Sequence, residues 1–165
     1  MANFSFDIVS EINLSEINNV FDQVKRELGT RYDFKNSISS LNWLDDQKSG
    51  FQIVTEDQLK LNAILDIIRK KLASRNISQK ILDLSNDIIS SNFKITYNIP
   101  FIKGLDQNKT KQLNLLIKSN YPKIKTSINN QTLKVSDSSK DNLQKVITLL
   151  KSSDLEFDIQ FINYR

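Results

Sequence analysis

The feature that most constrains this fold is the order in which two hydrophobic periodicities follow one another along the chain. Alternation of apolar and polar residues predicts strands, and apolar residues spaced three and four apart predict amphipathic helices. The order strand, helix, strand, strand, helix, strand ends at about residue 90 and starts again at residue 92. We therefore predict two domains that share one architecture, with little residue identity between them.

The first set of elements begins with a strand over residues 3–8, where Phe4 and Phe6 alternate with polar residues. Its two helices open at residues 13–16 and 55–58, which both have the spacing of a capping box. The apolar faces of these helices are Leu14, Ile17, Val20, Phe21, Val24 and Leu28, and Leu61, Ile64, Leu65, Ile68 and Leu72. The remaining segments are strands over residues 38–44, 51–55 and 81–84 and a Ser/Asn-rich linker over residues 85–92.

The second set of elements repeats this order. Its strands are predicted over residues 93–101, 124–128, 133–135 and 157–161, and its helices from near Asp106 to before Pro122 and from Ser138 to Leu150. Asn129 and Asn130 join the two middle strands, because Asn tolerates the positive φ angles that tight hairpin turns require.

Each set fits a split βαβ unit, a four-stranded antiparallel sheet with both helices on one face. The predicted fold class is therefore α+β, a tandem of two ferredoxin-like (RNP-like) domains. We place the first domain at residues 1–90 and the second at residues 91–165, and the terminal strands can exchange between the two.

The composition excludes several kinds of chemistry. The chain has no Cys and no His, which excludes disulfides, zinc sites with the usual ligands and imidazole proton transfer. With three glycines it also has no glycine-rich phosphate loop. The acidic pairs lie at predicted turns and helix starts, where carboxylates serve as caps. We therefore expect no catalytic residues, no metal and no cofactor, and hence no enzyme.

The sequence also lacks features of membrane and exported proteins. No apolar run approaches the roughly 20 residues that a membrane helix needs. The start of the chain has no basic residue followed by an apolar block, so we predict no signal peptide. A cytoplasmic location follows as the expectation.

Charge is distributed unevenly between the two predicted domains. Residues 1–90 contain 11 basic and 13 acidic side chains, a net charge of −2, whereas residues 91–165 contain 12 and 6, a net charge of +6. A basic domain indicates an anionic partner, either a phosphorylated ligand or nucleic acid. Nonspecific RNA or DNA binding by the C-terminal domain is therefore one hypothesis for this chain.

RNA-binding domains of this shape stack bases on aromatic residues of the open sheet face. Here Phe4, Phe6 and Phe51 have the alternation of the helix-covered face. The residues predicted on the open faces are Ser5, Asp7, Gln52 and Val54 in the first domain, and Lys94, Thr96, Asn98, Thr132, Lys134 and Ser136 in the second. These faces favour phosphate contacts over base stacking.

The stretch richest in binding chemistry is Arg31, Tyr32, Asp33, Phe34 and Lys35, between a predicted helix and a predicted strand. It combines two cations, a carboxylate and two aromatic rings. One interpretation is a structural junction in which both rings face the core and the charges are solvated. The other is a ligand site, in which the cations meet phosphates and the rings stack on bases.

Five short motifs together resemble the YajQ family from end to end. They are residues 6–11 (Phe-Asp-Ile-Val-Ser-Glu), 31–35 (Arg-Tyr-Asp-Phe-Lys), 56–57 (Glu-Asp), 140–144 (Lys-Asp-Asn-Leu-Gln) and 160–165 (Gln-Phe-Ile-Asn-Tyr-Arg). The resemblance implies a bacterial cytoplasmic, non-enzymatic nucleotide-binding protein with two RNP-like domains. Cyclic di-GMP is the ligand that it implies for some members, with nucleic acid or a transcription factor as further partners.

The resemblance and the residue chemistry together give a hypothesis for one ligand site. Its candidate residues are Arg31, Tyr32, Asp33, Phe34, Lys35, Lys140, Gln160, Asn163 and Arg165. The arginines and lysines would contact phosphates, the aromatic rings would stack on a base, and Asp33, Gln160 or Asn163 would meet guanine edges.

Overall fold

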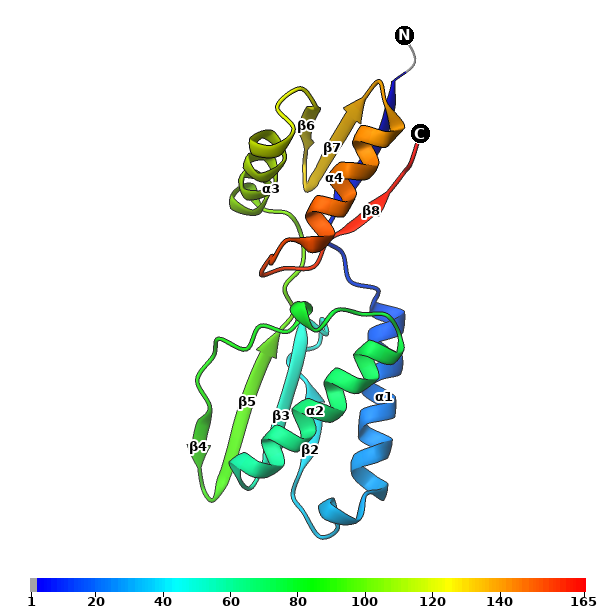
Figure 1. Cartoon of the computed structure of the whole chain (residues 1–165). Helices are drawn as coiled ribbons and strands as arrows, with labels where there is room; N and C mark the ends of the chain where they lie inside the picture. Colours follow the sequence, from blue (N-terminus) through cyan, green and yellow to red (C-terminus); the bar gives the residue numbers. More distant parts are fainter. Residues whose placement is uncertain (1–2) are drawn as a thin grey trace. The chain divides into compact units, whose positions relative to one another are not determined.

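The structure is a computed structural model that describes residues 3–165. These residues form two compact units (Figure 1). The first, which we call the split unit, consists of residues 3–11 and 103–165. The second, the inserted unit, is the continuous segment Ile12–Ile102. The chain therefore leaves the split unit after its first strand and returns to it 91 residues later.

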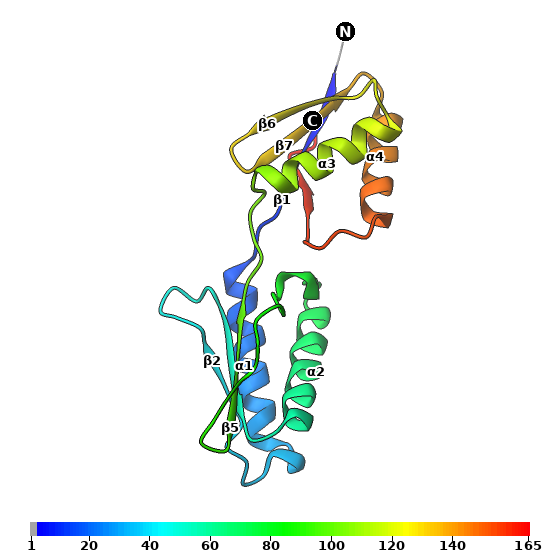
Figure 2. The same cartoon turned by 90° about the vertical axis from the view of Figure 1, so that its left-hand side faces the viewer.

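The split unit has the element order of a ferredoxin-like domain. Its elements are β1 (Phe4–Val9), α3 (Gln107–Asn120), β6 (Lys125–Asn129), β7 (Thr132–Asp137), α4 (Lys140–Ser152) and β8 (Gln160–Ile162). The strands form one antiparallel sheet in the order β6-β7-β1-β8. Figure 2 shows the β6–β7 hairpin with α3 and α4 beside it.

The inserted unit has the same sheet order with a different chain order. Its elements are α1 (Leu14–Thr30), a 3-10 turn (Tyr32–Phe34), β2 (Ser40–Trp43), β3 (Gly50–Thr55), α2 (Gln58–Ser74), a second 3-10 turn (Gln79–Ile81), β4 (Ile89–Ser91) and β5 (Lys94–Pro100). The antiparallel sheet runs β2-β3-β5-β4, and α1 and α2 lie side by side.

The predicted tandem of two α+β, ferredoxin-like domains is confirmed. The strands, however, are not shared between the two sheets by a single division of the chain at residue 90. The strand β1 pairs with β7 and β8, and β5 pairs with β3 and β4. The first strand of each predicted set thus belongs to the sheet of the other set, the exchange that the sequence left open. Both strands alternate in the way a central strand requires, so periodicity alone does not assign them.

Burial follows the predicted alternation. Phe6 and Ile8 in β1, and Phe51 and Ile53 in β3, are almost fully buried, while the residues between them are partly exposed. The core of the inserted unit joins the sheet to both helices and includes a stack of Phe21 on Trp43, whose ring centroids are 4.2 Å apart. One face of each sheet therefore carries the core and the other is free for function.

Five local predictions were wrong. The segment predicted as a linker contains β4, which has no alternation to detect because all three of its residues are exposed. The strand predicted at residues 81–84 is reduced to a single bridge from Leu82 to Phe101, and the last strand begins at Gln160 because Phe157 packs into the core from a loop. The caps of two helices, Asp57 and Ser139, lie beyond the predicted ones.

Within residues 3–165, no helix is long and apolar enough to cross a membrane. In the same range, no group of three or more acidic side chains is arranged to hold a metal ion.

The strand exchange predicts which fragments fold. A fragment of residues 12–102 contains every strand of its sheet, whereas a fragment of residues 1–90 lacks β5, which pairs on both sides. We expect cooperative thermal unfolding, followed by circular dichroism, for the first fragment and none for the second. The opposite result would contradict the exchange.

The two glycines of the inserted unit predict opposite effects of an added methyl group. A Cβ at Gly50 would collide with the Ile99 carbonyl oxygen and lie 2.7 Å from the Pro100 Cα, while a Cβ at Gly29 meets nothing within 4 Å. We expect Gly50→Ala to destabilise the unit by about 1–3 kcal/mol. Gly29→Ala, inside α1, is expected to stabilise the unit by about 0.5–1 kcal/mol. Urea titration of both variants and of the parent chain measures these changes.

Candidate functional site

The Arg31–Lys35 stretch belongs to the inserted unit and forms a tight turn directly after α1. The Arg31 N–H donates to the Glu27 carbonyl oxygen at 2.9 Å, and the Lys35 N–H donates to the Tyr32 carbonyl oxygen at 3.1 Å. The turn carries the chain from the helix toward β2. The side chains of this turn therefore differ in their contacts and in their exposure to solvent.

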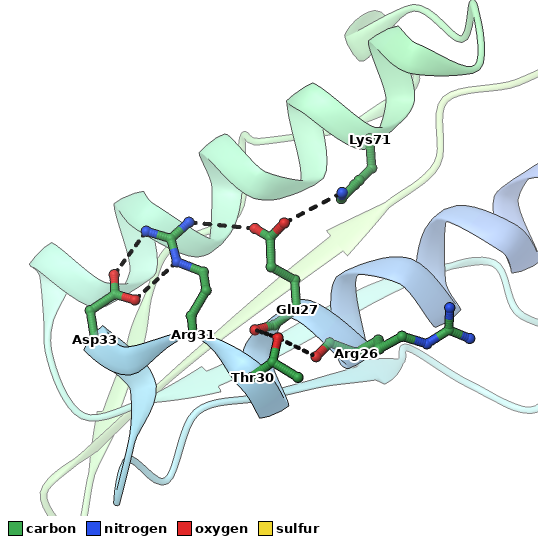
Figure 3. A network of polar contacts seen from close by, with 6 residues as sticks. All are labelled: Arg26, Glu27, Thr30, Arg31, Asp33 and Lys71. Carbon is green, nitrogen blue, oxygen red and sulfur yellow. Dashed lines mark hydrogen bonds and ion pairs between the residues drawn. The ribbon is translucent and has the colours of Figure 1, made fainter.

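Arg31 is held by two carboxylates (Figure 3). Its Nε and Nη2 donate to the two oxygens of Asp33, both at 2.9 Å, and its Nη1 donates to Glu27 at 3.4 Å. The hydrogen bonds from Arg31 lower the pKa of Asp33. Glu27 also pairs with Lys71 of α2 at 3.4 Å. Arg31 and Asp33 thus stabilise the turn, with three of the Arg31 N–H donors used inside the protein.

The two aromatic residues of the turn have different environments. Phe34 is buried in the core of the inserted unit, with the Arg31 guanidinium 5.6 Å from its ring centroid. Tyr32 is 88% exposed. Of the two rings, Tyr32 is therefore the one that can stack on a ligand, and the junction interpretation applies to Phe34 alone.

A pocket of about 430 Å³ lies beside this turn. It is lined by Lys25, Leu28 and Gly29 of α1, by Phe34, Lys35, Asn36 and Ser37 of the turn region, and by Ser39, Ser40, Leu41 and Asn42 at β2. Apolar side chains form part of the wall, and hydroxyl, amide and ammonium groups form the rest. Such a mixture is typical of sites for small polar ligands.

Lys25 and Lys35 give the pocket a positive charge. Both side chains are exposed, and neither has a carboxylate partner within residues 3–165. The Lys25 ammonium lies 5.3 Å from the centroid of the Phe21 ring, which places it against the helix surface. Two unpaired ammonium groups at one pocket favour an anionic ligand.

The segment 37–39 of the pocket wall is anchored by Glu56. This carboxylate accepts hydrogen bonds from the Ser37 hydroxyl at 2.7 Å and the Ile38 N–H at 3.1 Å, and it pairs with Lys60. Burial raises the pKa of Glu56, but these hydrogen bonds outweigh burial and the net shift is downward. The ionised carboxylate therefore holds the wall in place.

A second, smaller pocket of about 330 Å³ lies between α1 and α2. It is lined by Gln23, Arg26, Glu27, Thr30 and Lys71. Lys71 is paired with Glu27, and the Arg26 side chain points away from this network (Figure 3). With its charges largely neutralised, this pocket is a weaker candidate for an anion.

Two of the predicted site residues in the split unit support its own structure. The Lys140 ammonium, at the start of α4, lies 4.8 Å from the centroid of the Phe4 ring. The Gln160 amide accepts from the Glu11 N–H and donates to Asp158, both at 2.8 Å. The Gln160 amide thus ties β8 to the end of β1.

Asn163 creates a bulge that reorients the last residue. It has φ of 57° and donates from its side chain to Asp7 at 2.9 Å. Asp7 pairs with Ile162, whereas Ser5 pairs through two backbone hydrogen bonds with Arg165, so the tail has one extra residue between the pairs. Because paired residues share a face, Arg165 lies on the same face as Ser5.

The face of the split unit opposite its core is basic. Sheet register places Lys125, Ser136, Ser5 and Arg165 in one row, and Lys134 opposite Asp7 in the next. Three cations, from β6, from β7 and from the tail after β8, therefore share this face, as the predicted alternation of β7 indicated. The structure places the predicted residues in two units: Arg31–Lys35 in the inserted unit, and Lys140, Gln160, Asn163 and Arg165 in the split unit.

The chain matches a known protein family. A family model described as nucleotide-binding protein YajQ-like matches residues 4–165. The chain belongs to the YajQ-like family. Curated relatives named nucleotide-binding protein include one from Desulfitobacterium hafniense, 39% identical over 98% of this chain and 97% of that protein, and one from Geotalea daltonii, 36% identical over 98% of both. Another, from Prochlorococcus marinus, is 41% identical over 70% of this chain and 68% of that protein.

The names of these YajQ-like relatives are those of binding proteins and not of enzymes.

Sequence reasoning identified Lys35 but missed Lys25, Asn36 and Asn42 of the pocket. Lys25 has the spacing of an ordinary exposed helix residue, and nothing in the sequence pairs it with β2. The pocket exists because α1 packs beside β2 and Gly29 adds no side chain there.

We predict that replacement of Glu56 lowers the stability of the protein in a pH-dependent way. The pKa of Glu56 is lowered, so its contribution is present above the ordinary glutamate pKa and is lost as the pH falls through the lowered pKa. We expect Glu56→Gln to lower the free energy of unfolding near neutral pH and to match the parent chain in acid. Urea titrations at both pH values test this. An equal loss at both would show that ionisation of Glu56 is irrelevant.

Proposed function

We propose that this protein binds a nucleotide in the pocket between α1, the Arg31–Lys35 turn and β2. The observation that carries the proposal is the pair of ammonium groups, Lys25 and Lys35, on a pocket with an apolar wall and no carboxylate among its lining residues. In this arrangement the lysines contact the phosphates. The Asn36 amide is available to the edge of a base with two donors and an acceptor. The Asn42 amide donates to the Ser40 hydroxyl at 3.1 Å and keeps a second donor and its acceptor for a base.

The surrounding turn fits this role. The ion pairs of Arg31 hold the turn that carries Lys35, so the backbone of Lys35 is positioned before a ligand arrives. Tyr32 lies next to this segment with 88% of its surface exposed and is the proposed stacking residue. The names of the YajQ-like relatives support nucleotide binding as the general activity.

We propose a cyclic dinucleotide of the cyclic di-GMP type as the ligand and a non-enzymatic, regulatory role in the cytoplasm. The pocket volume of about 430 Å³ suits one nucleotide unit, and the second unit would extend over the exposed Tyr32. Regulation would follow if the occupied pocket presents a changed surface to a partner such as a transcription factor.

The basic face of the split unit supports a second candidate, nonspecific RNA or DNA binding. Lys125, Lys134 and Arg165 share that face, which suits a phosphate backbone. The net charge of the split unit supports nucleic-acid binding less strongly than the net charge of residues 91–165 did. The split unit has 11 basic and 8 acidic side chains and the inserted unit 12 and 11, net charges of +3 and +1.

Calorimetric titration with cyclic di-GMP, GTP and a short RNA at low and moderate salt separates the candidates. We expect saturable dinucleotide binding that changes little with salt, because a pocket neutralises few phosphates. Lys25→Ala and Lys35→Ala should each weaken it by about tenfold or more, since each removes a charged hydrogen bond. Lys70→Ala is the matched control, an exposed lysine of the same unit outside the pocket.

Two outcomes would overturn the pocket proposal. One is the absence of heat with both nucleotides. The other is dinucleotide binding that neither lysine variant weakens relative to Lys70→Ala. Salt-sensitive RNA binding that Lys134→Ala or Arg165→Ala reduces would support the second candidate.

A further inference from the structure

The hairpin between β4 and β5 places an aromatic ring at its most exposed point. Asn92 and Phe93 form the turn with φ values of 52° and 63°, and Phe93 is 99% exposed. A left-handed backbone is unfavourable for a residue with a side chain, because its Cβ comes too close to the following carbonyl oxygen. Asn tolerates it well, but Phe does not. Phe93 is therefore unfavourable both in its backbone and in its contact with water.

This ring is one of several exposed apolar side chains in the same segment of the chain, which we call the apolar strip. Leu84, Ile88, Ile89 and Phe93 are four exposed large hydrophobic residues within ten positions of one another. The segment 88–93 has no charged residue and no proline. It contains β4, the edge strand of its sheet, whose outer side has no neighbouring strand among residues 3–165.

The other edge strands carry features that discourage pairing with another chain. A lysine, Lys125, begins β6 at one edge of the split unit's sheet, and β8 at its other edge leads into the bulge at Asn163. Beside β2, the pocket carries Lys25 and Lys35. Charged residues and bulges are the usual means by which edges avoid association. The edge at β4 lacks both, and its short length of three residues is the one such feature that it has.

We propose that β4 pairs with β4 of a second copy of this chain, in antiparallel orientation about a two-fold axis near Ser90. The pairing would join two four-stranded sheets into one of eight strands. It would also cover Ile88, Ile89 and Phe93 of both copies, which are exposed in one chain. A two-fold contact uses the same surface on both partners, as most dimers do.

Charge selects the antiparallel orientation. Asp87 precedes β4 and Lys94 begins β5 at the hairpin tip, so opposite charges flank the uncharged segment 88–93. Antiparallel pairing brings Asp87 of each copy toward the tip of the other, where Lys94 lies. Parallel pairing would bring like charges together, which is unfavourable. The strip is thus complementary to itself in one orientation.

This interface is independent of the proposed nucleotide site. The order β2-β3-β5-β4 puts the pocket strand β2 and the pairing strand β4 at opposite edges of the sheet. A dimer formed through β4 leaves Lys25 and Lys35 free. Nucleotide binding and dimerisation can therefore fail separately in experiment.

Sedimentation equilibrium over a range of protein concentrations tests the proposal. We expect the parent chain to approach twice the mass of one chain, and Ile89→Lys to weaken dimerisation at least about tenfold, because the added charges face each other across the axis. Leu59→Lys, at a 79% exposed leucine of α2, is the matched control and should leave the dimer intact. Circular dichroism verifies that both variants fold.

Further variants test the geometry. Asp87→Lys and Lys94→Asp should each weaken the dimer, and the double variant should restore it, since the exchanged charges still meet.

Because the chain has no cysteine, Ser90→Cys gives a single thiol near the axis and should form an intermolecular disulfide on mild oxidation. Ser152→Cys, an exposed serine of α4, is the control.

The proposal is overturned if the parent chain is a monomer at its highest soluble concentration. It is equally overturned if Ile89→Lys associates like Leu59→Lys, or if Ser90→Cys forms no more disulfide than Ser152→Cys. Failure of the charge exchange to restore the dimer would reject the antiparallel arrangement.

Discussion

Each unit depends on one central strand, which forms hydrogen bonds with a neighbouring strand on both of its sides. The strand β1 lies between β7 and β8, and β5 lies between β3 and β4. A central strand satisfies its N–H and C=O groups on both sides, so its loss would divide a sheet into fragments. The strand β1 is separated from the rest of its unit by the whole inserted unit, whereas β5 lies within the continuous segment Ile12–Ile102. The inserted unit is closed by its last strand, and the split unit is closed by its first.

The candidate binding features lie on sheet edges and open faces because the helices occupy the remaining faces. The pocket follows the edge strand β2, the apolar strip follows β4, and the basic cluster lies on the open face of the split unit. Polar interactions then adjust these regions locally. Glu56 holds the pocket wall, the carboxylates around Arg31 hold the turn, and Asn163 turns Arg165 onto the basic face.

The element types were largely predictable, because buried faces impose a period on the sequence. The exception, β4, is exposed along its whole length, so no buried face marks it, and only the turn at Asn92 and Phe93 defines it. The candidate site was predictable only in part. Lys35 stands out in a dense motif, whereas Lys25 shares a pocket with Asn42, 17 positions away, through packing of α1 beside β2.

From the sequence alone come the four helices, the strands other than β4, the α+β class, the inward faces of these elements and the absence of thiol and imidazole chemistry. It also carried the motifs of the YajQ-like family. The tertiary structure decided which sheet receives β1 and β5, which cations share a pocket or a face, and that Arg31 is bound by Asp33 and Glu27. Periodicity reports which side of an element is buried, but the partner that buries it is selected by strand pairing between distant segments.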